Sequence, residues 1–442
     1  MFMSYGVLSL IAVVLILAIA VMTRRTLFAM AVGLTAGTIV VAAKTNANVV
    51  DQWFGYLYTS LSNEDLQWLL ILISVFGILI ALFEKSNAVV DFGVWASRFI
   101  RTKKAGLLGT FILGVVIFVD DYLNNLAVGT TMKGITDRLD VPRTQLGYVV
   151  NSAAAPICIL IPFSSWAAYF GGLMEGQGVV GSDGTGLSAY IQGLPFTFYG
   201  FFAVIVVLLM CFGIMPIIGP MKKDVVRARE THNVFPEGTD QGLIDSVVNE
   251  ELPDRSKAKP WNFLIPLAIL IIFTFATGTD VLKGAGAGTL AAMILYLAER
   301  KFSFREMCEY SFEGVMNMGF VLVLSVLAFA VQALNGDLGL SDFIIDVTLP
   351  IMKGAFLPMV VFLVCAVYAY ATGCFWDLAA IILPLVVPLA TAMHVDPIIA
   401  CSAVFSGAAF GSNTCLYGDG IIICSQGVQI KAVDLMLATL PY

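Results

Sequence analysis

Long apolar stretches, separated by short polar segments, run along most of the chain. A membrane-spanning helix needs about 20 mostly apolar residues, with a lower limit near 17. Stretches of this kind predict spanning helices at Gly6–Met22, Leu27–Ala43, Leu66–Leu82, Phe196–Ile218, Phe263–Thr279 and Val315–Leu334, and a shorter one at Gly284–Ala298. The pattern therefore predicts an all-α integral membrane protein that crosses the bilayer several times.

Four further stretches are also apolar but are interrupted by polar residues or proline. They are Ala105–Gly134, Thr144–Phe170, Ala355–Ala392 and Ile398–Tyr417. Each half of the chain contains two of them, in the same order. Between the halves, the segment Met221–Pro260 is charged and of mixed sign, which predicts a loop outside the membrane.

The positions of lysine and arginine favour a hairpin at Ala105–Gly134. Basic residues concentrate on the cytoplasmic side of membrane proteins. Suppose that Arg24 is cytoplasmic, that Ala105–Gly134 is a re-entrant hairpin that enters from inside, and that Ala355–Ala392 is one that enters from outside. All but three of the 24 basic residues then lie inside. The three exceptions are Lys44, Lys283 and Lys353. We therefore expect the N-terminus outside, loop 221–260 in the cytoplasm, and the protein in the inner (cytoplasmic) membrane of the cell.

This topology gives the two halves opposite orientations, as in transporters built from inverted repeats with sites near the midplane. Val141–Ala155 aligns without gaps on Val395–Ala409, 254 residues later, and Asp91-Phe92 matches Asp342-Phe343 at a similar offset. We expect each repeat to contain a re-entrant hairpin and a broken transmembrane helix. The predicted domains are a first transmembrane repeat at 1–175, a linking helix and cytoplasmic loop at 176–260, and an inverted second repeat at 261–442.

Composition and charge narrow the functional class. Apolar residues make up 59% of the 442 residues and charged residues 12%, against about 25% charged in soluble domains. The net charge of −7 gives no basic footprint for nucleic acid. The eight cysteines form no C-x-x-C pair, so we interpret them as small buried apolar residues. The chain has no P-loop motif, which favours coupling to an ion gradient over ATP hydrolysis. We expect no enzymatic activity and no cofactor besides the coupling ions Na⁺ or H⁺.

Asp120, Asp121, Asn124 and Asn125 interrupt the first predicted hairpin. A carboxylate at the centre of a membrane helix costs about 2.5–3.5 kcal/mol on insertion scales. We therefore expect this tip to line water, to bind a cation or to cap exposed backbone. The alternative is a solvated turn near the membrane surface.

The second predicted hairpin has Trp376 and Asp377 at its tip. The indole can form one wall of a substrate pocket, and Asp377 is the only carboxylate in that tip. The alternative is an interfacial tryptophan followed by a carboxylate that caps a helix.

The interrupted helices supply hydroxyl, amide and carboxylate groups, which suit Na⁺ or the polar ends of a solute. The other interpretation of the small residues among them is helix packing. We expect ion binding, with Na⁺ at some of the positions, by Asp120, Asp121, Asn124, Asn125, Asn151, Ser152 and Asp419. We expect substrate binding by Ser164, Ser165, Trp376, Asp377, Ser406, Ser412, Asn413 and Thr414.

These segments resemble those of a known family. Phe118–Tyr169, which begins FVDDYLNN, resembles the first-half signature of the NhaC-type sodium/proton antiporter family, and Thr372–Ala390 with Ser406–Ser425 resembles its second-half signature. The resemblance implies the ion-transporter superfamily, whose members bind ligands between the hairpin tips and broken helices of two inverted repeats. Members exchange Na⁺ and H⁺, and some exchange organic acids or amino acids for these ions.

The chain departs from the antiporter pattern at three positions. Asn151 stands where the family often has Asp, and Ser412-Asn413 stands where it has an Asp-His pair, whereas Asp419 matches a later Asp. Ser412-Asn413-Thr414 is similar to a Ser-Asn-Thr motif of dicarboxylate transporters in the same superfamily. Asn151, Ser412 and Asn413 cannot carry protons as the family's Asp and His residues can. We therefore expect a small organic acid or amino acid to be exchanged for Na⁺ or H⁺. The alternative is a plain Na⁺/H⁺ antiporter.

Two other classes compete with secondary transport. An intramembrane aspartyl protease needs two aspartates that share a proton, and Asp120 with Asp419 are candidates, but the expected Tyr-Asp and Gly-x-Gly-Asp contexts are absent. A passive channel also uses broken helices, although inverted repeats with two hairpins favour coupled transport. We expect the lipid bilayer and a small solute as partners, no nucleic acid, and a homodimer as a possible assembly.

Overall fold

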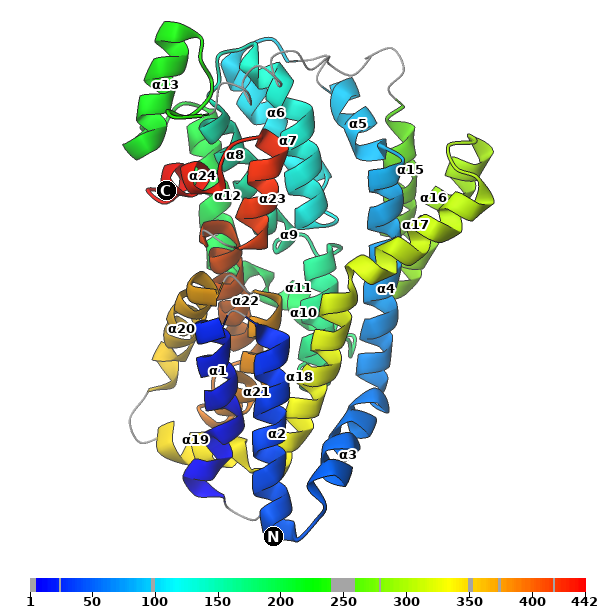
Figure 1. The fold of residues 1–442 in the computed structure, drawn as a ribbon, viewed down its shortest axis with the longest axis vertical. Coiled ribbons are helices and arrows are strands. Elements are labelled where there is room, and N and C mark those ends of the chain that lie inside the picture. The colour runs from blue at the N-terminus through cyan, green and yellow to red at the C-terminus, as the bar shows by residue number, and fades with distance from the viewer. Residues whose placement is uncertain are drawn as a thin grey trace. The chain divides into compact units, whose positions relative to one another are not determined.

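The computed structural model describes residues 5–23, 25–96, 100–239, 259–277, 280–348, 353–372, 375–415 and 418–442. Within these ranges the chain folds into α-helices and short 3₁₀ helices, and it forms no strand (Figure 1). The prediction of an all-α membrane protein is confirmed.

The chain divides into two compact units. Unit 1 comprises Met1–Ser74, Ala167–Phe198 and Val315–Gly411, and unit 2 comprises Val75–Trp166, Tyr199–Gly314 and Ser412–Tyr442. The elements of unit 1 are η1 (Gly6–Leu10), α1 (Ile11–Thr23), α2 (Thr26–Thr45), α3 (Val49–Leu61), α11 (Gly186–Gly193), η3 (Leu194–Phe196), α18 (Gly319–Asp337), α19 (Leu340–Thr348), η4 (Gly354–Phe356), α20 (Leu357–Thr372) and α21 (Trp376–Ala392).

The elements of unit 2 are α5 (Ala88–Ala96), α6 (Lys103–Val116), α7 (Asp121–Asp137), α8 (Arg143–Ser152), α9 (Ala155–Cys158), α12 (Phe198–Cys211), α13 (Gly219–Thr231), α15 (Trp261–Ala276), α16 (Val281–Ala298), α17 (Phe304–Asn317), α23 (Asp419–Val428) and α24 (Ala432–Thr439). The boundary between the units falls within α4 (Glu64–Lys85), α10 (Ser165–Gly176) and α22 (Pro397–Thr414), and near the ends of α12 and α17.

Four helices in the described ranges are long and apolar enough to cross a membrane: α2, α4, α16 and α18. They coincide with four of the predicted spans. The predicted single span Phe196–Ile218 is wrong, because α12 ends at Cys211 and its start is bent by 53° against the preceding helix. Gly213 adopts the left-handed conformation, with φ of 74°, and terminates α12 there. The apolar composition continues to Ile218 after the helix has stopped.

The first interrupted stretch is a hairpin, as predicted. Its arms α6 and α7 pack against each other. The outer ends of the two arms also meet, because Lys103 Nζ donates a hydrogen bond to the Asp140 carbonyl at 3.2 Å. The chain therefore returns to the end at which it entered.

The second hairpin has the same form within unit 1. Its arms α20 and α21 pack together. Gly354 lies at the outer end of the first arm, where a Cβ would stand 2.7 Å from the carbonyl oxygen of Met393 at the end of the second arm. This close approach requires glycine and shows that both outer ends lie side by side.

The order and length of the elements recur along the chain. Helices α7 and α21 both have 17 residues, and each is followed by a left-handed residue, Asp140 or His394, 254 positions apart. Helices α5 and α19 both have nine residues, and each follows a left-handed residue, Asn87 or Gly339, 252 positions apart. The backbone thus carries the duplication that the short sequence alignment predicts.

Each unit combines elements from both halves of the chain. Unit 1 joins α1–α3 of the first half with α18–α21 of the second, and unit 2 joins α5–α9 of the first half with α15–α17 and α23 of the second. Corresponding elements of the two halves therefore lie in opposite units.

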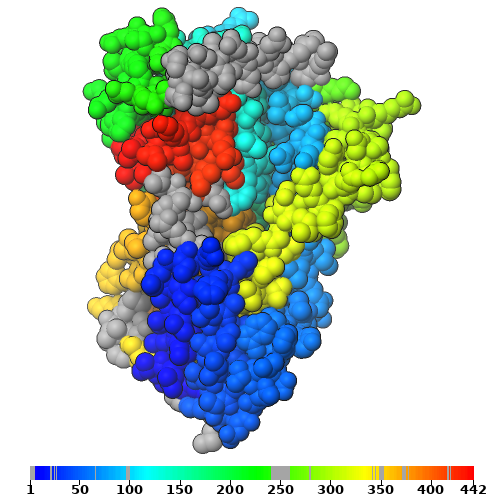
Figure 2. Space-filling model, viewed as in Figure 1, coloured from blue at the N-terminus to red at the C-terminus, as the bar shows by residue number. Residues whose placement is uncertain are grey.

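Large apolar side chains face outward on the long helices. On α1 and α2, drawn in blue in Figure 2, Val14, Phe28 and Ile39 are each at least half exposed. Leu290 and Ile294 on α16 are exposed to a similar degree. Large exposed apolar side chains on long helices are typical of a surface that lipid covers.

Candidate functional site

The polar tip of the first hairpin is buried inside unit 2. Asp120, Asp121, Asn124 and Asn125 each expose 2% of their surface or less. They therefore do not form a solvated turn, and the alternative proposed for this tip is wrong.

Asp120 caps the amino end of α7. One carboxylate oxygen accepts hydrogen bonds from the backbone N–H groups of Tyr122 and Leu123 at 3.0 and 3.1 Å. The other accepts a hydrogen bond from the Ser165 hydroxyl at 2.9 Å, and the Ser165 N–H donates to the Val119 carbonyl at 2.8 Å. Asp120 and Ser165 thus join the hairpin tip to the first turn of α10, which gives both side chains a structural function.

Asn124 joins the tip to the broken helix α8–α9. Its amide nitrogen donates to the carbonyls of Gly114, Ile117 and Ala153 at 2.7, 3.2 and 3.0 Å. These carbonyls lie at the carboxyl ends of α6 and α8, where helical hydrogen bonds are missing. Asn124 therefore replaces the missing donors, whereas its own Oδ1 is buried without a hydrogen-bond partner.

Asp121 lies inside the same tip and contacts a tryptophan. Its Oδ1 accepts a hydrogen bond from the indole Nε1 of Trp166 at 2.9 Å, and both side chains are fully buried. Asp121 and Asn125 are one turn apart and share a face of α7. Asn125 lies on that face with neither its Oδ1 nor its Nδ2 in a hydrogen bond.

Ser412 and the amino end of α23 approach Asn125. A Cβ placed on Gly420 would stand 3.3 Å from Ser412 Oγ and 3.9 Å from Asn125 Nδ2. The Ser412 hydroxyl is buried and also lacks a hydrogen-bond partner, and Gly418, the residue before α23, has no side chain to cap the helix. Buried polar groups without partners are rare in folded proteins and point to a bound ligand or water.

A chain of side-chain hydrogen bonds connects α8, α22 and α12 beside this point. Asn151 Nδ2 donates to Asn413 Oδ1 at 2.6 Å and to its carbonyl at 2.9 Å. Asn413 Nδ2 then donates to the Tyr199 hydroxyl at 2.8 Å. The two asparagines that distinguish this chain from the family pattern therefore bind each other.

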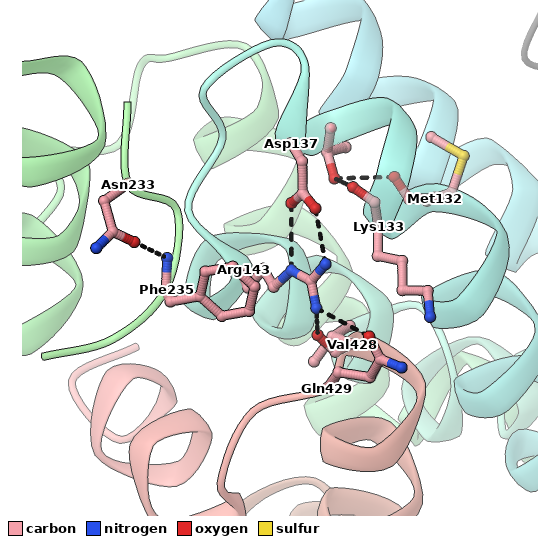
Figure 3. A network of polar contacts seen from close by, with 9 residues as sticks. Met132, Lys133, Asp137, Arg143, Asn233, Phe235, Val428 and Gln429 are labelled. Atoms are coloured by element: carbon pink, nitrogen blue, oxygen red, sulfur yellow. Dashed lines mark hydrogen bonds and ion pairs between the residues drawn. The ribbon is translucent and has the colours of Figure 1, made fainter. Parts of the chain in front are cut away.

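Arg143 holds the helices around the tip together at their other ends, as Figure 3 shows. The guanidinium is fully buried and forms two hydrogen bonds to Asp137 of α7, at 2.7 and 3.3 Å. It also donates to the carbonyl of Val428 and to Gln429 at the end of α23, and it stacks 4.4 Å from the Phe235 ring centroid. Arg143 thereby fixes the positions of α7, α8 and α23 relative to one another.

The tip of the second hairpin is aromatic where the first is polar. Trp376 is 8% exposed and packs edge-on against Tyr169 of α10 at 5.1 Å between ring centroids. Phe405 stacks on Phe170 at 4.3 Å. Phe405 stands 254 positions after Asn151 and Trp376 stands 255 after Asp121, so an aromatic cluster in unit 1 corresponds to the polar cluster in unit 2.

The remaining predicted site residues fall into three groups. Ser164 donates to the Cys158 carbonyl at 2.6 Å and closes the turn before α10. Ser152 and Ser406 are buried, the latter without a hydrogen-bond partner, and Thr414 is partly exposed. Asp377 is the second residue of α21 and Asp419 the first of α23, but their side chains lie outside the described residues.

Three participants were not among the predicted site residues. Trp166 directly follows Ser164 and Ser165, which are predicted to bind substrate, so its position in the sequence indicates that its indole N–H can belong to the site. Tyr199 lies in a long apolar stretch, and Arg143 is the first residue of α8, so neither carries a local signal. Among the described residues no three His, Cys, Asp or Glu side chains converge as metal ligands.

Comparison with known proteins identifies relatives of the whole chain. The family model described as "Na+/H+ antiporter family" matches residues 157–442. An uncharacterised protein of Haemophilus influenzae is 25% identical, in an alignment that covers 99% of this chain and 88% of that protein.

Two solved structures have a similar fold. The YdaH transporter of Alcanivorax borkumensis superposes with a TM-score of 0.60 at 13% identity, covering 95% of this chain and 94% of that one. MtrF of Neisseria gonorrhoeae superposes with a TM-score of 0.53 at 14% identity, covering 84% of this chain and 77% of that one. The expected resemblance to sodium/proton antiporters is confirmed by the family match.

Proposed function

Because the chain belongs to the Na⁺/H⁺ antiporter family, we propose that this ion-coupled antiporter exchanges a small organic acid or amino acid for Na⁺ or H⁺. The proposal places the coupling ion at Asp121 and the carboxylate of the solute beside Asn125, Ser412 and the amino end of α23. It also places the protein in the inner membrane, with the N-terminus outside and loop 221–260 in the cytoplasm.

The observation that carries this proposal is the group of unpartnered polar atoms at Asn125 and Ser412. A helix amino end, an amide N–H and a hydroxyl are all donors, and together they suit an anion. A carboxylate of the solute would satisfy them at once. Such a site also needs no proton carrier of its own, which agrees with the neutral residues Ser412 and Asn413.

Asp121 supplies the coupling function. A fully buried ionised carboxylate is costly unless it binds a cation or holds a proton. The hydrogen bond from Trp166 orients the carboxylate but does not neutralise it. Asp121 lies one turn from Asn125 on the same helix face. Exchange of Na⁺ and H⁺ at the Asp121 carboxylate would therefore couple ion binding to binding of the solute beside Asn125.

One of the structural neighbours supports an organic solute. MtrF belongs to a class of antimetabolite efflux pumps. This fold therefore does not restrict its members to inorganic ions. The second candidate function is plain Na⁺/H⁺ antiport, which the description of the matching family favours.

Flux measurements in proteoliposomes test the proposal. The purified protein is assayed for Na⁺-driven proton movement with and without a panel of small carboxylates and amino acids. We expect at least one solute to increase ion flux severalfold. Full Na⁺/H⁺ exchange without any organic solute would instead establish plain cation antiport.

Ser412→Ala localises the solute site. A hydrogen bond to a charged group is worth about 1.5–3 kcal/mol, so this variant should raise the KM for the solute roughly 10-fold or more. Ser425→Ala is the matched control, because Ser425 on α23 donates to the Ile422 carbonyl at 2.7 Å and has a partner already. Equal KM values in the two variants would remove Ser412 from the site.

A further inference from the structure

Gly420, the second residue of α23, leaves a polar cradle open between α7, α22 and α23. A Cβ at this position would stand 3.1 Å from the Ser412 carbonyl oxygen, 3.3 Å from Ser412 Oγ and 3.9 Å from Asn125 Nδ2. All three atoms are polar, so a side chain at position 420 would occupy the space that their partner needs. The cradle belongs wholly to unit 2 and is part of the solute site proposed above.

Asn125 reaches this cradle with an amide that no protein group pairs. The side chain is 1% exposed, and neither Oδ1 nor Nδ2 forms a hydrogen bond within the described part of the chain. Rotation of the amide by half a turn gives the same result, because both atoms are unpaired. The site therefore contains an unused acceptor in addition to the donors that the proposed function assigns to a carboxylate.

The two helix ends at the cradle have opposite polarity. Helix α23 begins here, and its first N–H groups carry a partial positive charge. Helix α22 ends here at Thr414, and the Ser412 carbonyl belongs to its last turn, which carries a partial negative charge. An anion alone interacts favourably with only the first of these ends. A solute with an anionic group and a neighbouring donor interacts favourably with both.

The covalent structure of the amide determines how close these two groups of the solute must be. Oδ1 and Nδ2 of Asn125 are bonded to the same carbon, so their partners on the solute are also close neighbours. In a carboxylic acid, the donor nearest to the carboxylate is a hydroxyl or ammonium group on the α-carbon. Such an acid pairs with the amide at two points, because its carboxylate accepts from Nδ2 and its α-substituent donates to Oδ1.

We propose that Asn125 is a specificity-determining residue, which selects acids with a hydroxyl or ammonium group on the α-carbon over acids without one. The inference rests on the proposed function, because it requires the carboxylate to bind beside Ser412 and the amino end of α23. An acid without the α-donor leaves Oδ1 buried and unpaired. Sites that must leave a polar group unpaired bind such an analogue poorly, and we expect a loss of affinity of about 10-fold or more.

Matched sets of acids test this selection in the purified full-length protein. Each set has one carbon skeleton, that of butyrate, 4-methylpentanoate or succinate, and contains the unsubstituted acid, its 2-hydroxy derivative and its 2-amino derivative. Binding is measured as the rise of Tm with acid concentration at fixed Na⁺ and ionic strength. In every set that binds, we expect both derivatives to have a Kd about 10-fold or more below that of the unsubstituted acid.

Asn125→Leu removes both polar atoms of the amide and keeps a branched side chain of similar shape. We expect it to fold with an unchanged or higher Tm in the absence of acid, because no protein hydrogen bond is lost. The three members of a set should then bind with similar Kd values. This result would assign the selection to the amide of Asn125 rather than to the rest of the site.

Gly420→Ala tests the cradle itself. Its Cβ fills the space beside Ser412 and Asn125, so we expect every acid to bind about 10-fold or more weakly. Gly286→Ala on α16 is the matched control, because a Cβ there has nothing within 4 Å, and its Kd values should equal those of the wild type. Asn125→Leu decides the proposal alone if Gly420→Ala does not fold.

The outcomes separate this inference from the proposed function. An unsubstituted acid that binds as tightly as its derivatives would overturn the inference but keep the solute site, since Oδ1 then has another partner, such as the coupling ion. Selection that persists in Asn125→Leu would also overturn the inference, because another residue then recognises the α-substituent. Binding of no acid from any set would overturn the organic solute of the proposed function together with the inference.

Discussion

Asp120 and Asp121 are adjacent in the sequence, but their carboxylates have different surroundings. Asp120 has an extended backbone, with φ of −153° and ψ of 141°, so its side chain turns back onto the first N–H groups of α7. Asp121 is the first helical residue, and its side chain instead meets the indole of Trp166. The sequence alone does not predict which of the two aspartates caps α7, because this depends on the backbone angles of Asp120.

Substitution of the two aspartates should separate capping from ion coupling. Asp121→Asn keeps the shape of the side chain and an acceptor for Trp166, so we expect the variant to fold but to lose ion-dependent transport. Asp120→Asn is the matched control, since asparagine caps helices about as well as aspartate, and its transport should persist. Ion flux in proteoliposomes measures transport by the two variants, and their Tm measures folding. Wild-type kinetics in Asp121→Asn would show that Asp121 has only a structural function.

Several site residues could be predicted from the sequence because polar groups inside apolar stretches are conspicuous. Asn125 and Ser412 belong to this class, and the structure brings them together within unit 2. The partner of Asn413 could not be predicted, because Tyr199 looks like any aromatic residue of an apolar helix. Likewise, Asn124 was expected to bind a cation, yet its amide serves three backbone carbonyls that only the folded break brings near.

Among the helices, interruptions were easier to predict than ends. Both hairpins follow from polar or glycine-containing tips within long apolar stretches, and both are present. The end of α12 at Cys211 was missed, because its signal is the single residue Gly213 within an apolar stretch that continues beyond it. Hydropathy reports which environment a segment occupies, whereas the local backbone decides where a helix stops.

The contacts of Arg143 predict a large difference between two arginines, Arg138 at the end of α7 and Arg143 at the start of α8. Arg143→Ala leaves Asp137 and the carbonyl of Val428 without their donor, which should cost about 3 kcal/mol of folding free energy. Arg138→Ala is the control, because Arg138 is exposed and should change stability by about 0.5 kcal/mol or less. Chemical or thermal denaturation of both variants provides the comparison. Similar stability of the two variants would show that the buried network contributes little.

For the molecule as a whole, the structure supports duplication but leaves the membrane orientation as a prediction. The paired helix lengths and left-handed residues show that the two halves share one plan. The sequence alignment detected this at a few positions only, because apolar helices of unrelated origin also share small residues. The orientation rests on the distribution of lysine and arginine.

Cysteine labelling in intact cells tests this orientation. Single cysteines at Arg101 and Arg138, at the outer ends of the first hairpin, should both be labelled only from the cytoplasm. Cysteines at Lys353 and His394, at the outer ends of the second, should both be labelled from outside. Labelling of Arg101 and Arg138 from opposite sides would contradict the re-entrant hairpin in a membrane.

The mixing of both halves within each unit has a consequence for biosynthesis. Unit 1 needs residues up to Gly411, and unit 2 needs residues up to Tyr442. Neither unit can therefore complete its packing while the ribosome is still translating the middle of the chain. The first 250 residues must wait in the bilayer with the polar tip of α7 lacking α23, its neighbour from the end of the chain. A truncated product is consequently left without a finished core in either unit, which makes it a natural target for membrane proteases.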